Sequence, residues 1–131
     1  MSDPIKHECG VALIRLRKPL EFYRDKYGTE LYGLKKLQML MSKQLNRGQD
    51  GAGLAAIKLN PEYGSRYIAR ERAIGSGAVS ALFDRLNKRY HSLNSEKVTN
   101  TSWLKKNYPY AGELLLGHLR YATHGKNSIE N

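Results

Sequence analysis

Apolar residues follow two different periods along the first third of the chain. Residues 9–16, Cys-Gly-Val-Ala-Leu-Ile-Arg-Leu, form a short apolar run that ends in alternation, which is typical of a largely buried strand. Residues 31–45 carry apolar side chains at helical spacing, with lysines off that stripe, and predict an amphipathic helix. The stripe comprises Leu31, Leu34, Leu37, Gln38, Met41 and Leu45. Residues 17–28 are charged and aromatic and are predicted to form an irregular excursion.

The rest of the chain predicts a hairpin, a second helix and a last strand. Residues 54–59 and 66–72 are expected to be strands, joined by the turn Asn-Pro-Glu-Tyr-Gly-Ser at 60–65. Residues 78–90 predict a helix, and residues 113–120 predict a strand. The apolar face of that helix comprises Val79, Leu82, Phe83, Leu86 and Tyr90.

Three glycine-rich or polar segments are predicted to lack regular structure. Residues 46–53 hold three glycines and predict a tight loop, residues 91–110 predict a surface loop, and residues 122–131 are expected to be irregular. The predicted order is strand, helix, strand, strand, helix, strand. Both helices are expected to pack on the sheet in a layered α+β domain.

Composition limits the classes of protein that fit. With 131 residues and 40% hydrophobic residues, the chain predicts at most one domain with a core. A single cysteine excludes a disulfide framework and a cysteine-based zinc site. No apolar run is long enough for a membrane helix, and residues 1–8 lack the apolar stretch of a secretory signal. We therefore expect a cytoplasmic protein with no membrane partner.

The net charge of +10 is compatible with nucleic-acid binding. The positive residues, however, are spread along the chain in small groups rather than gathered on one element among aromatic residues. This spread favours a solvated surface, and we expect no nucleic-acid partner.

The only cysteine, Cys9, is the first residue with candidate chemistry. A thiol is nucleophilic only as the thiolate, and its ordinary pKa is about 8.5, so it needs a base. If residues 1–8 were removed, the α-amine of Cys9, with a pKa of about 7.7–8.0, would serve as that base. The alternative is that Cys9 is a small buried residue of the strand.

Two further segments carry candidate functional groups. Residues 47–53, Arg-Gly-Gln-Asp-Gly-Ala-Gly, let the backbone approach a ligand closely, although an ordinary helix-to-strand turn explains them equally well. Residues 117–125, Gly-His-Leu-Arg-Tyr-Ala-Thr-His-Gly, place Arg120 where it can bind a carboxylate, although a polar loop is the alternative. His118 and His124 are six residues apart and fit no single helix face, so we expect no metal site.

Together, in this order, the Cys9-Gly-Val start and these two segments resemble class II glutamine amidotransferases, the N-terminal-nucleophile glutaminases. Within that family the second segment is most similar to the amidophosphoribosyltransferase branch, whereas the Thr-His-Gly ending of the third is also found in hexosephosphate aminotransferases. The resemblance implies a four-layer αββα N-terminal-nucleophile hydrolase fold. It also implies glutamine hydrolysis that supplies ammonia for phosphoribosylamine formation from phosphoribosyl pyrophosphate in purine biosynthesis.

The resemblance implies a role for each matching residue. Cys9 is the nucleophile, and Arg47 and Gly48 organise it as part of the catalytic group. The glutamine-binding residues are Arg120, Tyr121, Thr123 and His124.

The resemblance also implies a domain plan. Residues 1–8 are expected to be a cleaved propeptide, and residues 9–131 the N-terminal part of the glutaminase domain, ending before its oxyanion-hole element. We expect such a piece to be inactive alone and to hold no cofactor, with Mg²⁺ and phosphoribosyl pyrophosphate bound by a separate phosphoribosyltransferase domain. The sequence does not indicate whether the full-length protein binds an iron–sulfur cluster. The expected partners are glutamine, that domain and further copies of the chain.

Two alternatives remain. One is a sibling amidotransferase with another acceptor, such as a sugar phosphate. The other is a non-catalytic domain that retains the glutaminase fold. Residues 17–30 and 91–110 are longer than the family pattern, and the former are either a surface excursion or a contact to another subunit or domain.

Overall fold

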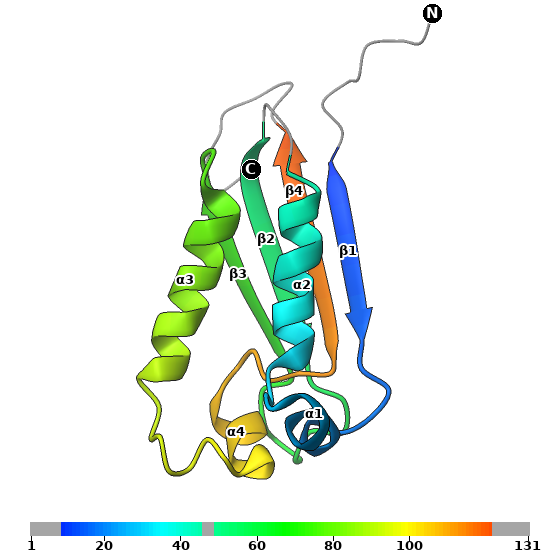
Figure 1. Cartoon of the computed structure of the whole chain (residues 1–131), viewed down its shortest axis with the longest axis vertical. Helices are drawn as coiled ribbons and strands as arrows, with labels where there is room; N and C mark the ends of the chain where they lie inside the picture. The colour runs from blue at the N-terminus through cyan, green and yellow to red at the C-terminus, as the bar shows by residue number, and fades with distance from the viewer. Residues whose placement is uncertain (1–8, 46–48, 122–131) are drawn as a thin grey trace, which may run out of the picture.

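One antiparallel sheet organises the computed structural model, which describes residues 9–45 and 49–121. Its strands are β1 (Gly10–Arg15), β2 (Gln49–Ile57), β3 (Ile68–Ile74) and β4 (Leu114–Tyr121), in the spatial order β1-β4-β2-β3 (Figure 1). All three neighbouring pairs are antiparallel, and β2 and β3 form the predicted hairpin. Together with the four helices of the described segments, this makes the domain mixed α+β, as predicted.

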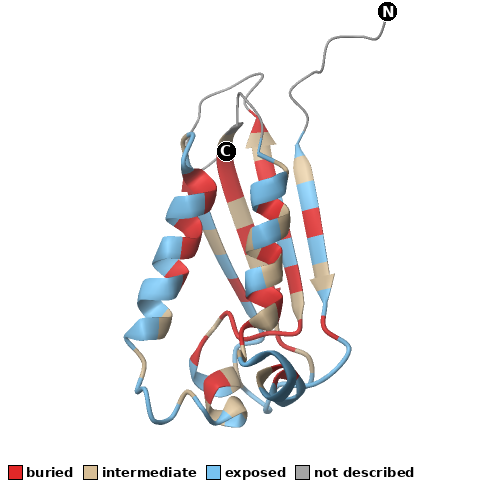
Figure 2. Cartoon of the chain, viewed as in Figure 1, coloured by how far each residue is buried: buried red, intermediate tan, exposed pale blue. Residues whose placement is uncertain are grey.

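Two helices cover one face of the sheet. Helix α2 (Tyr32–Lys43) packs on β1 and β4, and α3 (Ala78–His91) packs on β2 and β3 (Figure 1). Their inward stripes are buried, as Figure 2 shows along both helices, and Leu37 and Leu82 are fully buried. Both helices therefore follow the predicted apolar spacing. Leu45 is the exception, since α2 ends at Lys43 and leaves Leu45 43% exposed.

The opposite face of the sheet is open within the described part of the chain. Val11 and Leu13 on β1 expose 65% and 57% of their surface, and Leu116 on β4 exposes 37%. Strand alternation explains this pattern, because Ala12 and Leu115 point toward the helices and are buried. An apolar sheet face of this kind is usually covered by another layer.

The prediction of an irregular excursion at residues 17–28 is wrong, because this segment contains helix α1 (Leu20–Tyr27). Pro19 precedes the helix, and Gly28 ends it in the left-handed conformation at φ 79°, with its N–H bonded to the Arg24 carbonyl. Within α1 only Leu20 and Tyr23 are buried. Two buried positions are too few to produce a visible helical stripe in the sequence.

Two further loop predictions are wrong in part. Residues 49–53 belong to β2, where Gly51 and Gly53 pair with β3 and β4 rather than forming a tight turn. Residues 101–107 form helix α4 (Thr101–Asn107), whose N-cap Asn100 accepts a hydrogen bond from the Trp103 N–H at 3.0 Å. No helix among the described residues is long and apolar enough to cross a bilayer.

Candidate functional site

The sheet brings the three candidate segments to one of its ends. Strand β1 begins at this end, β4 finishes there, and β2 begins there (Figure 1). The strand register aligns the three segments, because Leu119 of β4 pairs with Gly10 of β1 on one side and with Ala52 of β2 on the other. Cys9 and Arg120 are the next residues toward the end, on neighbouring strands that lie about 4.8 Å apart.

Cys9 is exposed at the start of β1. The alternative of a small buried strand residue is therefore wrong. The position follows from alternation: Gly10 faces α2, where a Cβ would meet the Gln44 side chain, while Val11 faces the open side of the sheet. The thiol is thus accessible to a substrate at the sheet end.

Arg120 and Tyr121 lie on opposite faces of β4. Tyr121 is buried under α2, and its hydroxyl donates to the Gln44 carbonyl at 3.1 Å. Arg120 pairs with Gly51 and is half-buried on the open face, the face that His118 also shares. The guanidinium therefore lies on the side of the sheet where Cys9 and Val11 are exposed, whereas Tyr121 has a packing role.

Gln44 fixes the end of α2 against both strands of the site. Its side-chain amide donates to the Val11 carbonyl at 3.2 Å, and its own carbonyl accepts from Tyr121. Because Gln44 is the C-cap of α2, these bonds set where the chain leaves the helix toward residues 46–48. This role could not be predicted from the apolar pattern, because Gln44 lies off the apolar stripe.

Asp50 is a second residue that the sequence analysis did not single out. Between Gln49, which pairs with Tyr121, and Gly51, which pairs with Arg120, β2 carries one extra residue, so Asp50 occupies a β-bulge. Both of its carboxylate oxygens are buried, and within residues 9–45 and 49–121 neither accepts a hydrogen bond. A buried carboxylate without a partner is costly, and such residues concentrate at functional sites. The sequence feature that could have indicated Asp50 is that it is the one carboxylate in the glycine-rich segment 47–53.

Four predicted site residues lie outside the described residues. These are Arg47, Gly48, Thr123 and His124. The last described residues before and after these segments, Leu45, Gln49 and Tyr121, lie at this same end of the sheet. Among the described residues, no three His, Cys, Asp or Glu side chains gather as a metal site.

Comparisons with protein-family models, with curated protein sequences and with solved structures found no match for this chain.

Proposed function

We propose that this chain carries the glutaminase chemistry of a class II glutamine amidotransferase, with Cys9 as its nucleophile. One observation carries the proposal: three segments far apart in sequence, each resembling a family motif, meet at one end of the sheet. An exposed thiol near an arginine at the same sheet end supports the proposal, because it places a candidate nucleophile beside a candidate carboxylate-binding group.

The reaction proceeds in two steps. With residues 1–8 removed, the α-amine of Cys9 takes the thiol proton, and Sγ attacks the side-chain carbonyl carbon of glutamine. The C–N bond breaks, the nitrogen takes the proton, and ammonia leaves a thioester on Cys9. Water then attacks the thioester, which releases glutamate and restores the thiol.

The remaining site residues position the substrate. Arg120 binds the α-carboxylate of glutamine through its planar fork, in a pair of parallel hydrogen bonds. We assign Thr123 and His124, the next candidates along the chain, to binding of the same substrate, whereas Tyr121 is buried on the opposite face of β4 and anchors that strand. Arg47 and Gly48 organise the thiol and the amine. Gln44 anchors the end of α2 to β1 through its bond to the Val11 carbonyl, and Asp50 lies in the bulge at the start of β2.

The open sheet face supports the finer fold proposal. In a four-layer αββα arrangement, a second sheet packs on the face of the first that its helices leave uncovered. Val11, Leu13 and Leu116 supply an apolar surface for such a layer, and a hollow of about 420 Å³ runs over the same face. We propose that the finished glutaminase domain covers this face with its second sheet.

The sequence of residues 47–53 is most similar to the amidophosphoribosyltransferase branch, and this supports phosphoribosyl pyrophosphate as the acceptor of the ammonia. We propose that ammonia passes to a phosphoribosyltransferase domain and displaces pyrophosphate from phosphoribosyl pyrophosphate, in purine biosynthesis. Mg²⁺ would belong to that domain.

The test is covalent labelling by a glutamine analogue that carries a diazoketone in place of the side-chain amide. Cys9 is the only cysteine, so a mass increase of one label reports on it alone. Labelling is a single alkylation of the thiol and needs no turnover, so it can occur in a piece that is inactive in glutamine hydrolysis. Protein that begins at Cys9 should be labelled, free glutamine should slow the labelling, and protein that retains residues 1–8 should resist it.

Arg120→Lys supplies the specific variant. It keeps the charge but loses the two-pronged geometry, and the labelling rate should fall about 10-fold or more, since a charge-assisted hydrogen bond contributes about 1.5–3 kcal/mol. Arg17→Lys, at an exposed position past the other end of β1, is the matched control and should change nothing. Equal rates in both variants, or labelling that glutamine does not slow, would overturn the proposal in favour of a non-catalytic domain.

A further inference from the structure

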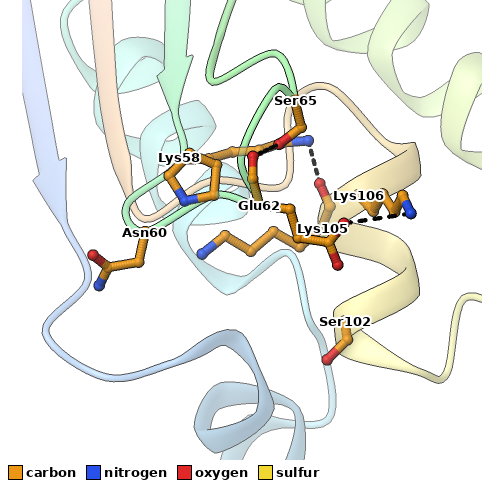
Figure 3. A pocket seen from close by; sticks show the side chains of 8 residues that line it. Lys58, Asn60, Glu62, Ser65, Ser102, Lys105 and Lys106 are labelled. Carbon is orange, nitrogen blue, oxygen red and sulfur yellow. Dashed lines mark hydrogen bonds and ion pairs between the residues drawn. The ribbon is translucent and has the colours of Figure 1, made fainter.

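A basic pocket lies at the end of the sheet farthest from Cys9. It has a volume of about 250 Å³ and is formed between the β2–β3 turn and α4 (Figure 3). Strand β2 separates it from the candidate glutaminase site by roughly 25 Å, at about 3.3 Å per residue. The residues that line it are Lys58, Asn60, Pro61, Glu62, Ser65, Ser102, Lys105 and Lys106.

Lys58 is the unusual member of this set, because it is 7% exposed and forms no ion pair with a carboxylate of the described residues. Its ammonium donates to the Lys105 backbone carbonyl, as the dashed line in Figure 3 shows. The ammonium of Lys105 is paired instead with Glu113, at 2.6 Å, and also donates to the Leu59 carbonyl. Burial, followed by the nearby charge of Lys105, lowers the pKa of Lys58 below 10.5.

The charged groups at the bottom of this pocket do not balance. The buried Lys58 and the partly buried Lys105 carry two positive charges, and Glu113, which is 8% exposed, is the acid that faces them. Glu113 is already committed to Lys105 and to the Leu59 N–H. A buried ion without a counterion is unfavourable, so the cluster lacks one negative charge.

The open side of the pocket is equipped to receive an anion. Lys106 lies at the rim, where its contact with Glu62 is 3.4 Å long and both side chains are more than half exposed. Such an exposed pair is weak, and Lys106 is free to turn toward a stronger acceptor. Ser102, in the first turn of α4, also lines the pocket and carries a hydroxyl (Figure 3).

We propose that this pocket binds a small phosphate-bearing ligand, whose oxygens accept hydrogen bonds from the ammonium groups of Lys58 and Lys106 and from the Ser102 hydroxyl. Phosphate supplies the missing negative charge and has enough oxygens for all three donors. The volume is below that of pockets for drug-sized molecules, so the ligand is of the size of a phosphorylated three- to five-carbon compound. This inference is independent of the proposed glutaminase activity.

The experiment is calorimetric titration with glycerol 3-phosphate at pH 7.5 and constant ionic strength, with glycerol as the uncharged comparison. The expected result is saturable one-to-one binding with a Kd below about 1 mM for the phosphate ester and none for glycerol. Absence of saturable binding at 10-fold higher ligand, on the order of 10 mM, would overturn the proposal.

Three variants locate the site. Lys58→Met should weaken binding about 10-fold or more, because it removes a charge-assisted hydrogen bond, and it should fold well, because it replaces a buried charge with an apolar side chain of similar length. Lys106→Gln should weaken binding several-fold without touching the buried cluster. Lys88→Gln, on the exposed side of α3, makes the same charge change away from the pocket and should bind like the unaltered protein. Equal affinity in all three variants, or equal weakening, would show that the ligand responds to net charge or binds elsewhere.

Discussion

Gly112 offers the sharpest test of the packing described here, because it lies against backbone rather than against a side chain. It precedes β4, where the Glu113 N–H donates to the Ile57 carbonyl at 3.1 Å. A Cβ added at Gly112 would lie 2.6 Å from the Ile57 carbonyl oxygen and 2.9 Å from its carbonyl carbon. Since β2 is hydrogen-bonded on both sides, that backbone has no free direction in which to move.

The cost of Gly112→Ala follows from this contact. Overpacking by one methyl group in a well-packed interior costs typically about 1–3 kcal/mol, and an immobile partner puts the cost at the upper end, about 2.5 kcal/mol. Unfolding entropy of about 2.1 cal/mol/K per residue gives about 275 cal/mol/K for a chain of 131 residues. Gly112→Ala should therefore lower Tm by about 9 °C.

Urea unfolding followed by circular dichroism, together with a thermal scan, measures both quantities. Gly53→Ala in β2 is the matched control, since its Cβ would meet the Arg72 Cγ at 3.4 Å and the Glu71 carbonyl at 3.5 Å, which are ordinary contacts. It should be neutral or stabilising by up to about 1 kcal/mol, because alanine reduces the entropy of the unfolded chain. If Gly112→Ala were as stable as Gly53→Ala, the approach of β4 to β2 described here would be wrong.

Three further changes test the core and its ionisable groups. Leu37→Ala, at a fully buried position of α2, should cost about 2–5 kcal/mol by urea titration. Glu113→Ala should cost about 3–5 kcal/mol in the same assay, because it leaves Lys105 without its partially buried counterion. Burial raises the pKa of Tyr108 above its ordinary 10.0, so the unfolded chain loses this proton first and stability should fall as pH rises past about 10. Tyr108→Phe, which also loses a bond to the Leu86 carbonyl, should cost about 1 kcal/mol at pH 7 and reduce that alkaline loss.

The main elements of the fold were predictable because burial there follows a regular period. The stripes of α2 and α3 are visible as spacings of apolar residues. Strand β1 instead carries apolar side chains on both faces, so the expectation of a largely buried strand is wrong for Val11 and Leu13. Helix α4 was not predicted, because burial within it follows no regular period. Within it only Leu104 is buried, although its Asn100 cap was a local signal of a helix start.

The start of β2 shows a different limit of sequence interpretation. Three glycines in eight residues predicted a loop, yet Gly51 and Gly53 lie in a paired strand. The pairing is decided by β3 and β4, which are distant in sequence, so local propensity could not predict it.

The segments that carry the candidate site residues could be predicted from the sequence, but the positions of these residues relative to one another could not. The residue types around Cys9 and Arg120 pointed to their chemistry, whereas their adjacency depends on the β1–β4 register. The burial of Asp50 depends on a bulge, and the anchoring by Gln44 depends on where α2 ends against β1. None of these follows from the order of residues along one segment.

The intact mass of the protein purified from its native host reports on the proposed nucleophile. Glutaminase chemistry at Cys9 requires a free α-amine, because among the groups proposed for the site this amine is the base. We expect a mass that corresponds to loss of Met1 to Glu8. A mass that retains those eight residues in the mature protein would contradict the proposed chemistry, because the thiol of Cys9 would then lack its proposed base.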